Sequence, residues 1–189
     1  MVAECLREAK YPGVEIEPQL QPLSGESFKL KSANLDVEAR SDVKCLGFWR
    51  RLRQAFFDCK VLSPYARSYL SKSHKQLYHE AEQSKNREYK DRINRVEHAD
   101  FTPLVFTTAG GMAPQSQIFL KRITRQISET KDVHPSIIAG WLRCRFSFAL
   151  LRTTLVCLRA SRGKKPKFSS PVDLGVDIER AVHESRVVY

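Results

Sequence analysis

Asp42, Asp58 and Lys60 have the residue types and spacing that suit metal-dependent phosphodiester hydrolysis. Mg²⁺ prefers carboxylate and carbonyl oxygens, often one or two carboxylates with several waters retained. A bound metal polarises the phosphoryl group and activates water, while a nearby ammonium offsets the developing negative charge. Asp58 and Lys60 are two residues apart, so in a strand their side chains share one face. The alternative is that these charges form only the solvated face of an exposed hairpin.

A β-hairpin over residues 39–61 would position these three residues. We expect strands at 39–49 and 54–61, and pairing between them would bring Asp42 towards Asp58 and Lys60. The connection is short and strongly basic, with Arg50, Arg51 and Arg53. On the other face of the second strand, three residues should point into apolar packing: Phe57, Cys59 and Val61.

Three further residues near the hairpin are weaker candidates. Asp36 and Glu38 supply carboxylates, but they precede the expected strand. Lys44 could replace Lys60 as the positive charge of the site.

The rest of the chain alternates between helical and extended patterns, which indicates a mixed α/β layer architecture. The expected elements, in order, are a helix at 2–10, a strand at 14–17, the hairpin, a long charged helix at about 64–96, a strand at 101–108, and helices at 114–129 and 135–160. A basic tail over 161–189 should be largely flexible. We therefore expect one domain over 1–160 followed by the tail.

The chain of 189 residues has a net charge of +11 and a pI near 9.6, which favours a polyanionic partner. Between Lys121 and Lys167 there are twelve Lys and Arg but only Glu129 and Asp132. The five cysteines lack Cys-x-x-Cys spacing, which indicates buried thiols in a reducing compartment and argues against zinc or disulfides. The apolar run 137–158 contains three arginines, which argues against a membrane span. With no signal peptide visible, we expect a nuclear or cytoplasmic protein.

The element order resembles the core of the PD-(D/E)XK restriction-endonuclease-like superfamily, with Asp42 and Asp58-Cys59-Lys60 at the motif positions. Longer strings are similar to the C-terminal region of retroelement reverse-transcriptase polyproteins of invertebrate animals. They are Ala-Arg-Ser-Asp-Val-Lys from Ala39, Phe-Phe-Asp-Cys-Lys-Val from Phe56, Phe-Thr-Pro-Leu-Val-Phe from Phe101, and Gly-Trp-Leu-Arg-Cys-Arg-Phe-Ser-Phe from Gly140. The similarity covers roughly 10–162.

The superfamily resemblance implies a further acidic residue on the first helix, and it suggests that this residue lies upstream of Met1. Glu4 and Glu8 are the local substitutes, and we expect both to be solvated helix charges. Without that acid the domain would be N-terminally truncated and its metal affinity lower.

Two groups of arginines are candidates for nucleic-acid contacts: the basic connection with Arg50, Arg51 and Arg53, and the line Arg145, Arg152 and Arg159. The arginines of the line are seven residues apart and share one helix face; they could track phosphates or simply reach from a buried helix to solvent. Trp49 and Trp141 are expected in the core. Gly110 and Gly111 fit a turn better than a phosphate loop.

The sequence thus predicts a metal-dependent DNA endonuclease domain of a retroelement. Asp42 and Asp58 would ligate Mg²⁺ or Mn²⁺ with help from the Cys59 carbonyl, and Lys60 would orient the attacking water. The alternatives are a catalytically inactive nucleic-acid-binding remnant, or an assembly module whose long helix docks on another part of the polyprotein. Expected partners are DNA or RNA and the reverse-transcriptase part of the element, with no membrane and no small-molecule cofactor.

Overall fold

The computed structural model describes residues 1–21 and 39–160. The chain divides into two compact units, Met1–Thr153 and Thr154–Tyr189, and helix α5 runs from the first into the second. Asp36, Glu38 and the predicted tail at 161–189 lie outside the described residues.

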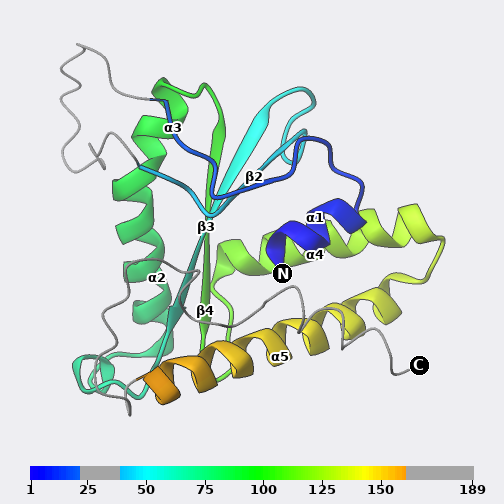
Figure 1. The fold of residues 1–189 in the computed structure, drawn as a ribbon. Coiled ribbons are helices and arrows are strands. Elements are labelled where there is room, and N and C mark those ends of the chain that lie inside the picture. Colours follow the sequence, from blue (N-terminus) through cyan, green and yellow to red (C-terminus); the bar gives the residue numbers. More distant parts are fainter. Residues whose placement is uncertain (22–38, 161–189) are drawn as a thin grey trace. The chain divides into compact units, whose positions relative to one another are not determined.

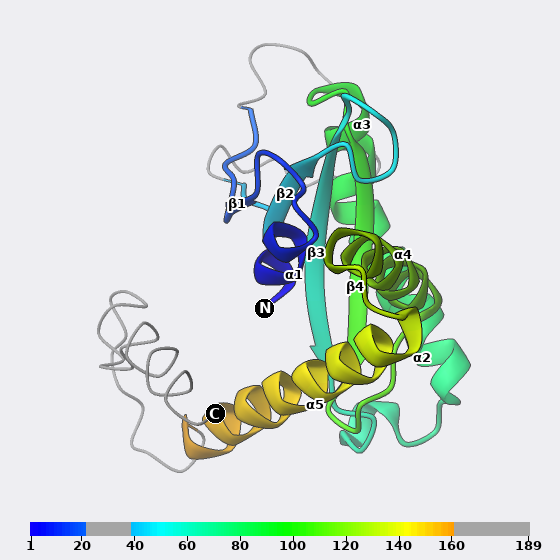
Figure 2. The same ribbon diagram turned by 90° about the vertical axis from the view of Figure 1, so that its right-hand side faces the viewer.

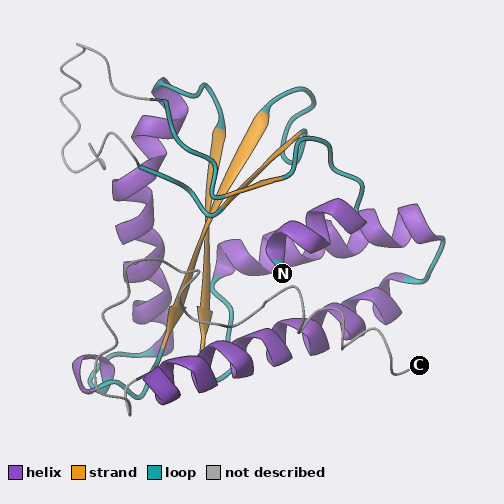
Figure 3. Ribbon diagram, viewed as in Figure 1, coloured by secondary structure: helices purple, strands orange, loops and turns teal. Residues whose placement is uncertain are grey.

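The first unit is a mixed α/β structure, as the sequence predicts, built on one four-stranded sheet (Figures 1 and 3). Its strands are β1 (Glu15–Ile16), β2 (Val43–Leu46), β3 (Gln54–Leu62) and β4 (Asp100–Thr107). Its helices are α1 (Val2–Glu8), η1 (Arg67–Tyr69), α2 (His74–Lys85), the π-helical turn η2 (Asn86–Lys90), α3 (Asp91–Arg95), α4 (Pro114–Lys131) and α5 (Pro135–Ala160).

The strands lie in the order β1-β2-β3-β4. β1 pairs antiparallel with β2, and β2 pairs antiparallel with β3 in a register that places Val43 opposite Phe57. β3 pairs with β4 in parallel, with Asp58 opposite Pro103. A parallel pair needs a crossover connection, and the helical segment from η1 to α3 supplies it. The first hairpin strand is much shorter than the predicted 39–49: only Val43–Leu46 forms β2.

The two faces of the sheet carry separate apolar clusters, and helices cover both faces (Figure 2). On one face, α1, α4 and α5 pack around a group of aromatic rings in which Phe48 contacts both Phe57 and Phe119 at 5.0–5.2 Å. On the other face, Phe56 packs with Tyr89 and Ile93 of η2 and α3. Odd-numbered residues of β3 therefore face α1, α4 and α5, and even-numbered residues face the crossover helices. Val61, predicted to be packed, is an exception because 39% of its surface is exposed.

The predicted continuous helix at 64–96 is wrong in its first third. Residues 67–69 form a short 3₁₀ turn, and the regular helix begins only after Ser73. The Ser73 hydroxyl accepts a hydrogen bond from the Gln76 backbone N–H, and the Gln76 side-chain oxygen accepts one from the Ser73 backbone N–H. This reciprocal pair is a capping box. This capping box fixes the start of α2 and outweighs the apolar spacing that favoured an earlier start. The helix then continues through a π-helical turn at Asn86–Lys90, a feature frequent at functional sites.

Candidate functional site

Asp58 lies in the middle of β3 on the face covered by the crossover helices, and it is only 4% exposed. Its cation partner is Lys85 at the end of α2, whose Nζ lies 2.9 Å from Oδ2. The contact is an ion pair between the Lys85 ammonium and the buried Asp58 carboxylate. Lys85 also approaches Glu88 at 3.4 Å and lies over the Tyr89 ring. The π turn thus gathers three groups around the Asp58 carboxylate.

Burial raises the pKa of Asp58 from 3.8 to about 6. The Lys85 ammonium works against this rise, and the negative charge of Asp42 adds to it. For Lys85 itself, burial favours the neutral amine, but the carboxylates of Asp58 and Glu88 outweigh burial and raise its pKa. At neutral pH the pair is therefore charged on both sides, with Asp58 close to its titration range.

Asp42 is the residue immediately before β2, across from Asp58 in the continued register of the β2–β3 pair. Its Oδ2 accepts a hydrogen bond from the Cys59 backbone N–H at 2.6 Å, and its carbonyl accepts one from Glu17 at 2.8 Å. Asp42 therefore adjoins β2 and lies across from Asp58 of β3. Asp42 also lines a largely apolar cleft of about 300 Å³ that includes Cys59 and residues of α1 and α5, whereas Asp58 does not.

Lys60 follows Asp58 on the same face of β3 and is half-buried. Among the described residues it makes no ion pair, in contrast to Lys44, which pairs with Glu15 of β1 at 2.7 Å. Lys44 therefore holds β1 to β2 and is not directed at the aspartates. Burial and the two neighbouring carboxylates strongly raise the pKa of the Cys59 thiol, so at neutral pH this side chain is protonated and is not a thiolate ligand.

The donor set fits Mg²⁺ in chemistry but is small. Two carboxylates on adjacent strands match the one or two that a magnesium site commonly uses. Over residues 1–21 and 39–160, no three His, Cys, Asp or Glu side chains gather as a metal-binding group. A divalent ion at Asp58 would also take the position at Oδ2 that Lys85 Nζ holds. In the structure this carboxylate oxygen is therefore held by the lysine.

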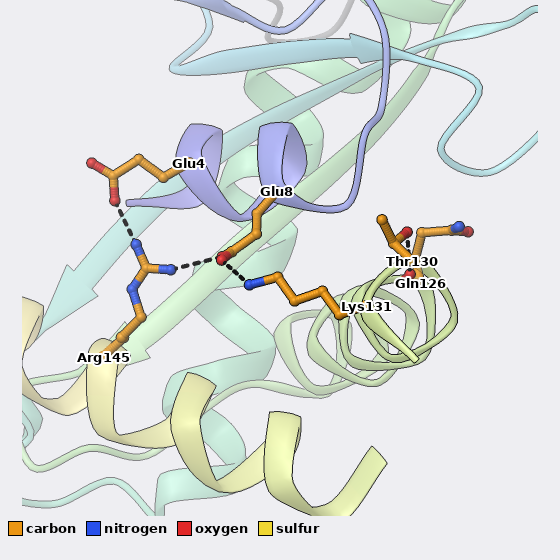
Figure 4. Close-up of polar contacts among 6 residues, drawn as sticks. All are labelled: Glu4, Glu8, Gln126, Thr130, Lys131 and Arg145. Atoms are coloured by element: carbon orange, nitrogen blue, oxygen red, sulfur yellow. Dashed lines mark hydrogen bonds and ion pairs between the residues drawn. The ribbon is translucent and has the colours of Figure 1, made fainter. Parts of the chain in front are cut away.

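The two glutamates of α1 are engaged elsewhere (Figure 4): Glu4 is exposed, as expected, whereas Glu8 is half-buried, and both form ion pairs. Arg145 of α5 donates to Glu8 Oε2 at 3.0 Å and to Glu4 Oε2 at 2.9 Å, and Lys131 of α4 pairs with the other oxygen of Glu8. The Arg145 guanidinium also stacks on Trp141, 4.4 Å from the ring centroid. These residues tie α1 to α4 and α5, so neither glutamate completes the aspartate site.

Of the predicted nucleic-acid contacts, the basic connection is the better placed. Arg50 and Arg51 are exposed, and Arg53 is held by Asp100 at 3.2 Å at the start of β4. In the arginine line, Arg145 is bound to two carboxylates, which removes support for its phosphate contact. Arg152 is exposed, and Arg159 lies in the last turn of α5 within the second unit.

Two side chains that were predicted to be buried are exposed. Trp141 is 38% exposed and forms the outer side of the Arg145 contact. Cys144 is exposed, whereas Cys5 and Cys45 are buried free thiols, as predicted. Burial raises the pKa of Cys45 to about 12. Burial is also the main cause that raises the pKa of Cys5 to about 11.

Lys85 is the site residue that the sequence did not indicate. It lies in a run with many charges, and only the packing of α2 on β3 distinguishes it from its neighbours. Its helical spacing was a usable signal. Lys85 lies four residues after Ala81 and four before Tyr89, so it must face the sheet if Leu77, Ala81 and Tyr89 do.

Comparison with known proteins adds no family: no protein-family model matches the chain, and no curated protein matches it. No helix in the described part of the chain is long and apolar enough to cross a lipid bilayer.

Proposed function

We propose that the first unit is a metal-dependent phosphodiesterase that acts on nucleic acid, of the restriction-endonuclease-like type. The observation that carries the proposal is the buried Asp58 carboxylate across from Asp42, with a pKa raised to about 6. A strongly shifted carboxyl that has a specific charge partner and a second acid as neighbour is a functional-site candidate on physical grounds.

In this proposal Asp42 and Asp58 would hold Mg²⁺ or Mn²⁺. The metal, when bound, would polarise the phosphoryl group and lower the pKa of bound water. Lys60 would hold the attacking water on the face of β3 that it shares with Asp58. Lys85 would leave Oδ2 and offset the negative charge that develops on the phosphoryl oxygens.

The topology supports the proposal. A helix, three strands, a helical crossover and a parallel fourth strand is the order that the sequence resemblance implies. The Asp-x-Lys run occupies the third strand, and the first aspartate adjoins the second strand. The basic connection between these strands supplies the positive charge that a polyanionic substrate needs.

A plasmid-nicking assay with Mg²⁺ or Mn²⁺ tests this function. Removing a metal ligand that contributes several kcal/mol to the transition state lowers the rate by at least about 100-fold. We therefore expect Asp58→Asn to lose nicking, while Asp91→Asn, a matched change at an exposed position of α3, keeps it. Equal nicking by both variants, or none by the unmodified chain under either metal, would exclude the proposal.

A second candidate is nucleic-acid binding without cleavage, and the Lys85–Asp58 ion pair favours it. In that case the ammonium at 2.9 Å serves permanently in place of the metal. The chain would then retard DNA with steep salt dependence and with no effect of EDTA. Nicking by the unmodified chain separates the two candidates, because the binding protein retards DNA without cutting it under Mg²⁺ or Mn²⁺.

A further inference from the structure

An open cleft of about 630 Å³ lies beside β4, apart from the aspartates. Three separate segments form its walls: the connection between β2 and β3, the helix from η2 to α3, and the start of α4. The residues that matter for its chemistry are Trp49, Arg50, Arg53, Lys90, Phe101 and Thr102. A cleft of this size is within the range that binds small organic ligands.

The charge of the cleft favours an anion. Arg50 and Lys90 are exposed at its rim. Arg53 is fixed between the Asp100 carboxylate, 3.2 Å from its Nε, and the Ala99 carbonyl, 3.3 Å from its NH2 nitrogen. Asp100 is the single acidic residue of the lining, against three cations. Phosphate groups are therefore suitable ligands for the rim.

The cleft also offers aromatic surface. The Trp49 indole donates to Thr102 Oγ1 at 2.7 Å, which fixes the ring against β4. Phe101 packs against Tyr89 with ring centroids 5.7 Å apart. Both Trp49 and Phe101 are half-buried, so part of each ring is open to the cleft. Stacking of a nucleobase on such rings is favourable and tolerates any base.

The backbone of β4 adds polar groups at the same place. β4 is an edge strand of the sheet. Among the described residues, a β-bridge on its outer side forms at the C-terminal half, between Phe106 and Met112. The half at Asp100–Thr102 adjoins the cleft. Free N–H and C=O groups of an edge strand are available to a ligand with its own donors and acceptors.

We propose that this cleft binds one nucleotide of a single-stranded nucleic acid, with the phosphate on Arg50 and Lys90 and the base against Trp49 and Phe101. A duplex keeps its bases stacked and paired, whereas a single strand presents a base and a phosphate together. The inference goes beyond the proposed function, because it assigns a single-stranded ligand to a cleft that neither aspartate lines. Thr102 is opposite Phe57, one residue from Asp58 on the next strand, so the cleft adjoins the strand that neighbours β3.

Binding is measured by fluorescence anisotropy of a labelled single-stranded oligonucleotide in EDTA, where cleavage cannot occur. The test variant is Arg50→Ala with Lys90→Ala. The charge-matched control is Lys121→Ala with Arg143→Ala, two exposed residues of α4 and α5 away from the cleft lining. We expect a loss of affinity of at least about 10-fold for the test variant and less than about threefold for the control. The salt slope of log K should fall by about 0.7 in the test variant, because one phosphate of the single strand is no longer neutralised by the protein.

Trp49 provides a second readout. Trp141→Phe leaves Trp49 as the sole tryptophan. Stacking should quench its fluorescence when the oligonucleotide is added, with little quenching by a duplex of the same sequence. Equal losses in the test and control variants, tighter binding of the duplex, or quenching by an extended peptide and not by the oligonucleotide would each overturn the proposal. Because the measurements use no metal, failure of nicking leaves this result unaffected.

Discussion

Replacing Lys85 with Met tests whether Asp58 is a buried charge held by a single ammonium. The variant keeps a side chain of similar length but removes the ion pair at 2.9 Å. Breaking a buried pair leaves the other charge uncompensated, which costs about 3–5 kcal/mol. Lys85 is 18% exposed, so partial solvent screening lowers our expectation to about 2–3 kcal/mol at pH 7.5.

The cost should depend on pH in a direction that the structure determines. The folded-state pKa of Asp58, about 6, is above its ordinary value of 3.8, so the folded protein binds this proton more tightly than the unfolded chain. The carboxyl therefore contributes most to stability below pH 3.8, and the contribution is lost as pH rises through about 6. Each pKa unit equals about 1.4 kcal/mol, so the whole loss is about 3 kcal/mol.

Lys85→Met removes an influence that lowers this pKa, so the Asp58 pKa in the variant rises further. At pH 5 the carboxyl is mostly protonated with or without Lys85, and the substitution should cost less than about 1 kcal/mol. At pH 7.5 the full cost of about 2–3 kcal/mol should appear. The two pH values together distinguish a buried charge from ordinary packing.

Urea unfolding followed by circular dichroism measures both values. Lys72→Met is the matched control, because Lys72 pairs with Glu80 at 2.6 Å on the surface. That pair should be worth less than about 1 kcal/mol at either pH. Asp58→Asn combined with Lys85→Met should recover most of the loss at pH 7.5. A cost for Lys85→Met that is the same at pH 5 and 7.5 would refute the reasoning.

Two other substitutions probe the first unit. Arg145→Met should lower the free energy of unfolding by about 1 kcal/mol, because it removes the ion pair to Glu4 and leaves Glu8 with Lys131 alone, whereas Arg152→Met at an exposed position should change it little in the same urea titration. In thiol labelling at pH 8, Cys144→Ser should remove a fast-reacting group, and Cys45→Ser should leave the fast phase unchanged because burial raises the pKa of Cys45 to about 12.

The parts of the fold that the sequence predicted are those whose own residues determine them. α4 and α5 begin at prolines 114 and 135, as expected, because proline is favoured in the first turn of a helix. β4 is a buried apolar run bounded by polar residues, and its position is also as predicted. The break before α2 is set by the capping box at Ser73, which the apolar spacing used for the expected helix does not show.

The parts that failed depend on contacts between distant segments. Arg145 shares a helix face with Arg152, and nothing in that spacing shows that Glu4 and Glu8 come to meet it 137 residues or more away in the chain. Lys85 likewise resembles its charged neighbours until α2 is packed on β3. Spacing within one element predicts which side chains share a face, but the partner on the other element depends on register and packing.

The Asp58–Lys85 pair is a functional candidate, whereas the contact of Arg145 with Glu4 and Glu8, here called the Arg145 clamp, is not. The clamp has two carboxylates around one guanidinium at the surface of helices that it joins, so it contributes to stability directly. Asp58 is on a central strand with a raised pKa, and an apolar residue of similar volume there would cost the fold less. A fold that carries such a cost next to a second acid and a basic cleft has a feature that packing alone does not account for. The proposed binding of a phosphate-bearing strand and a metal would account for it.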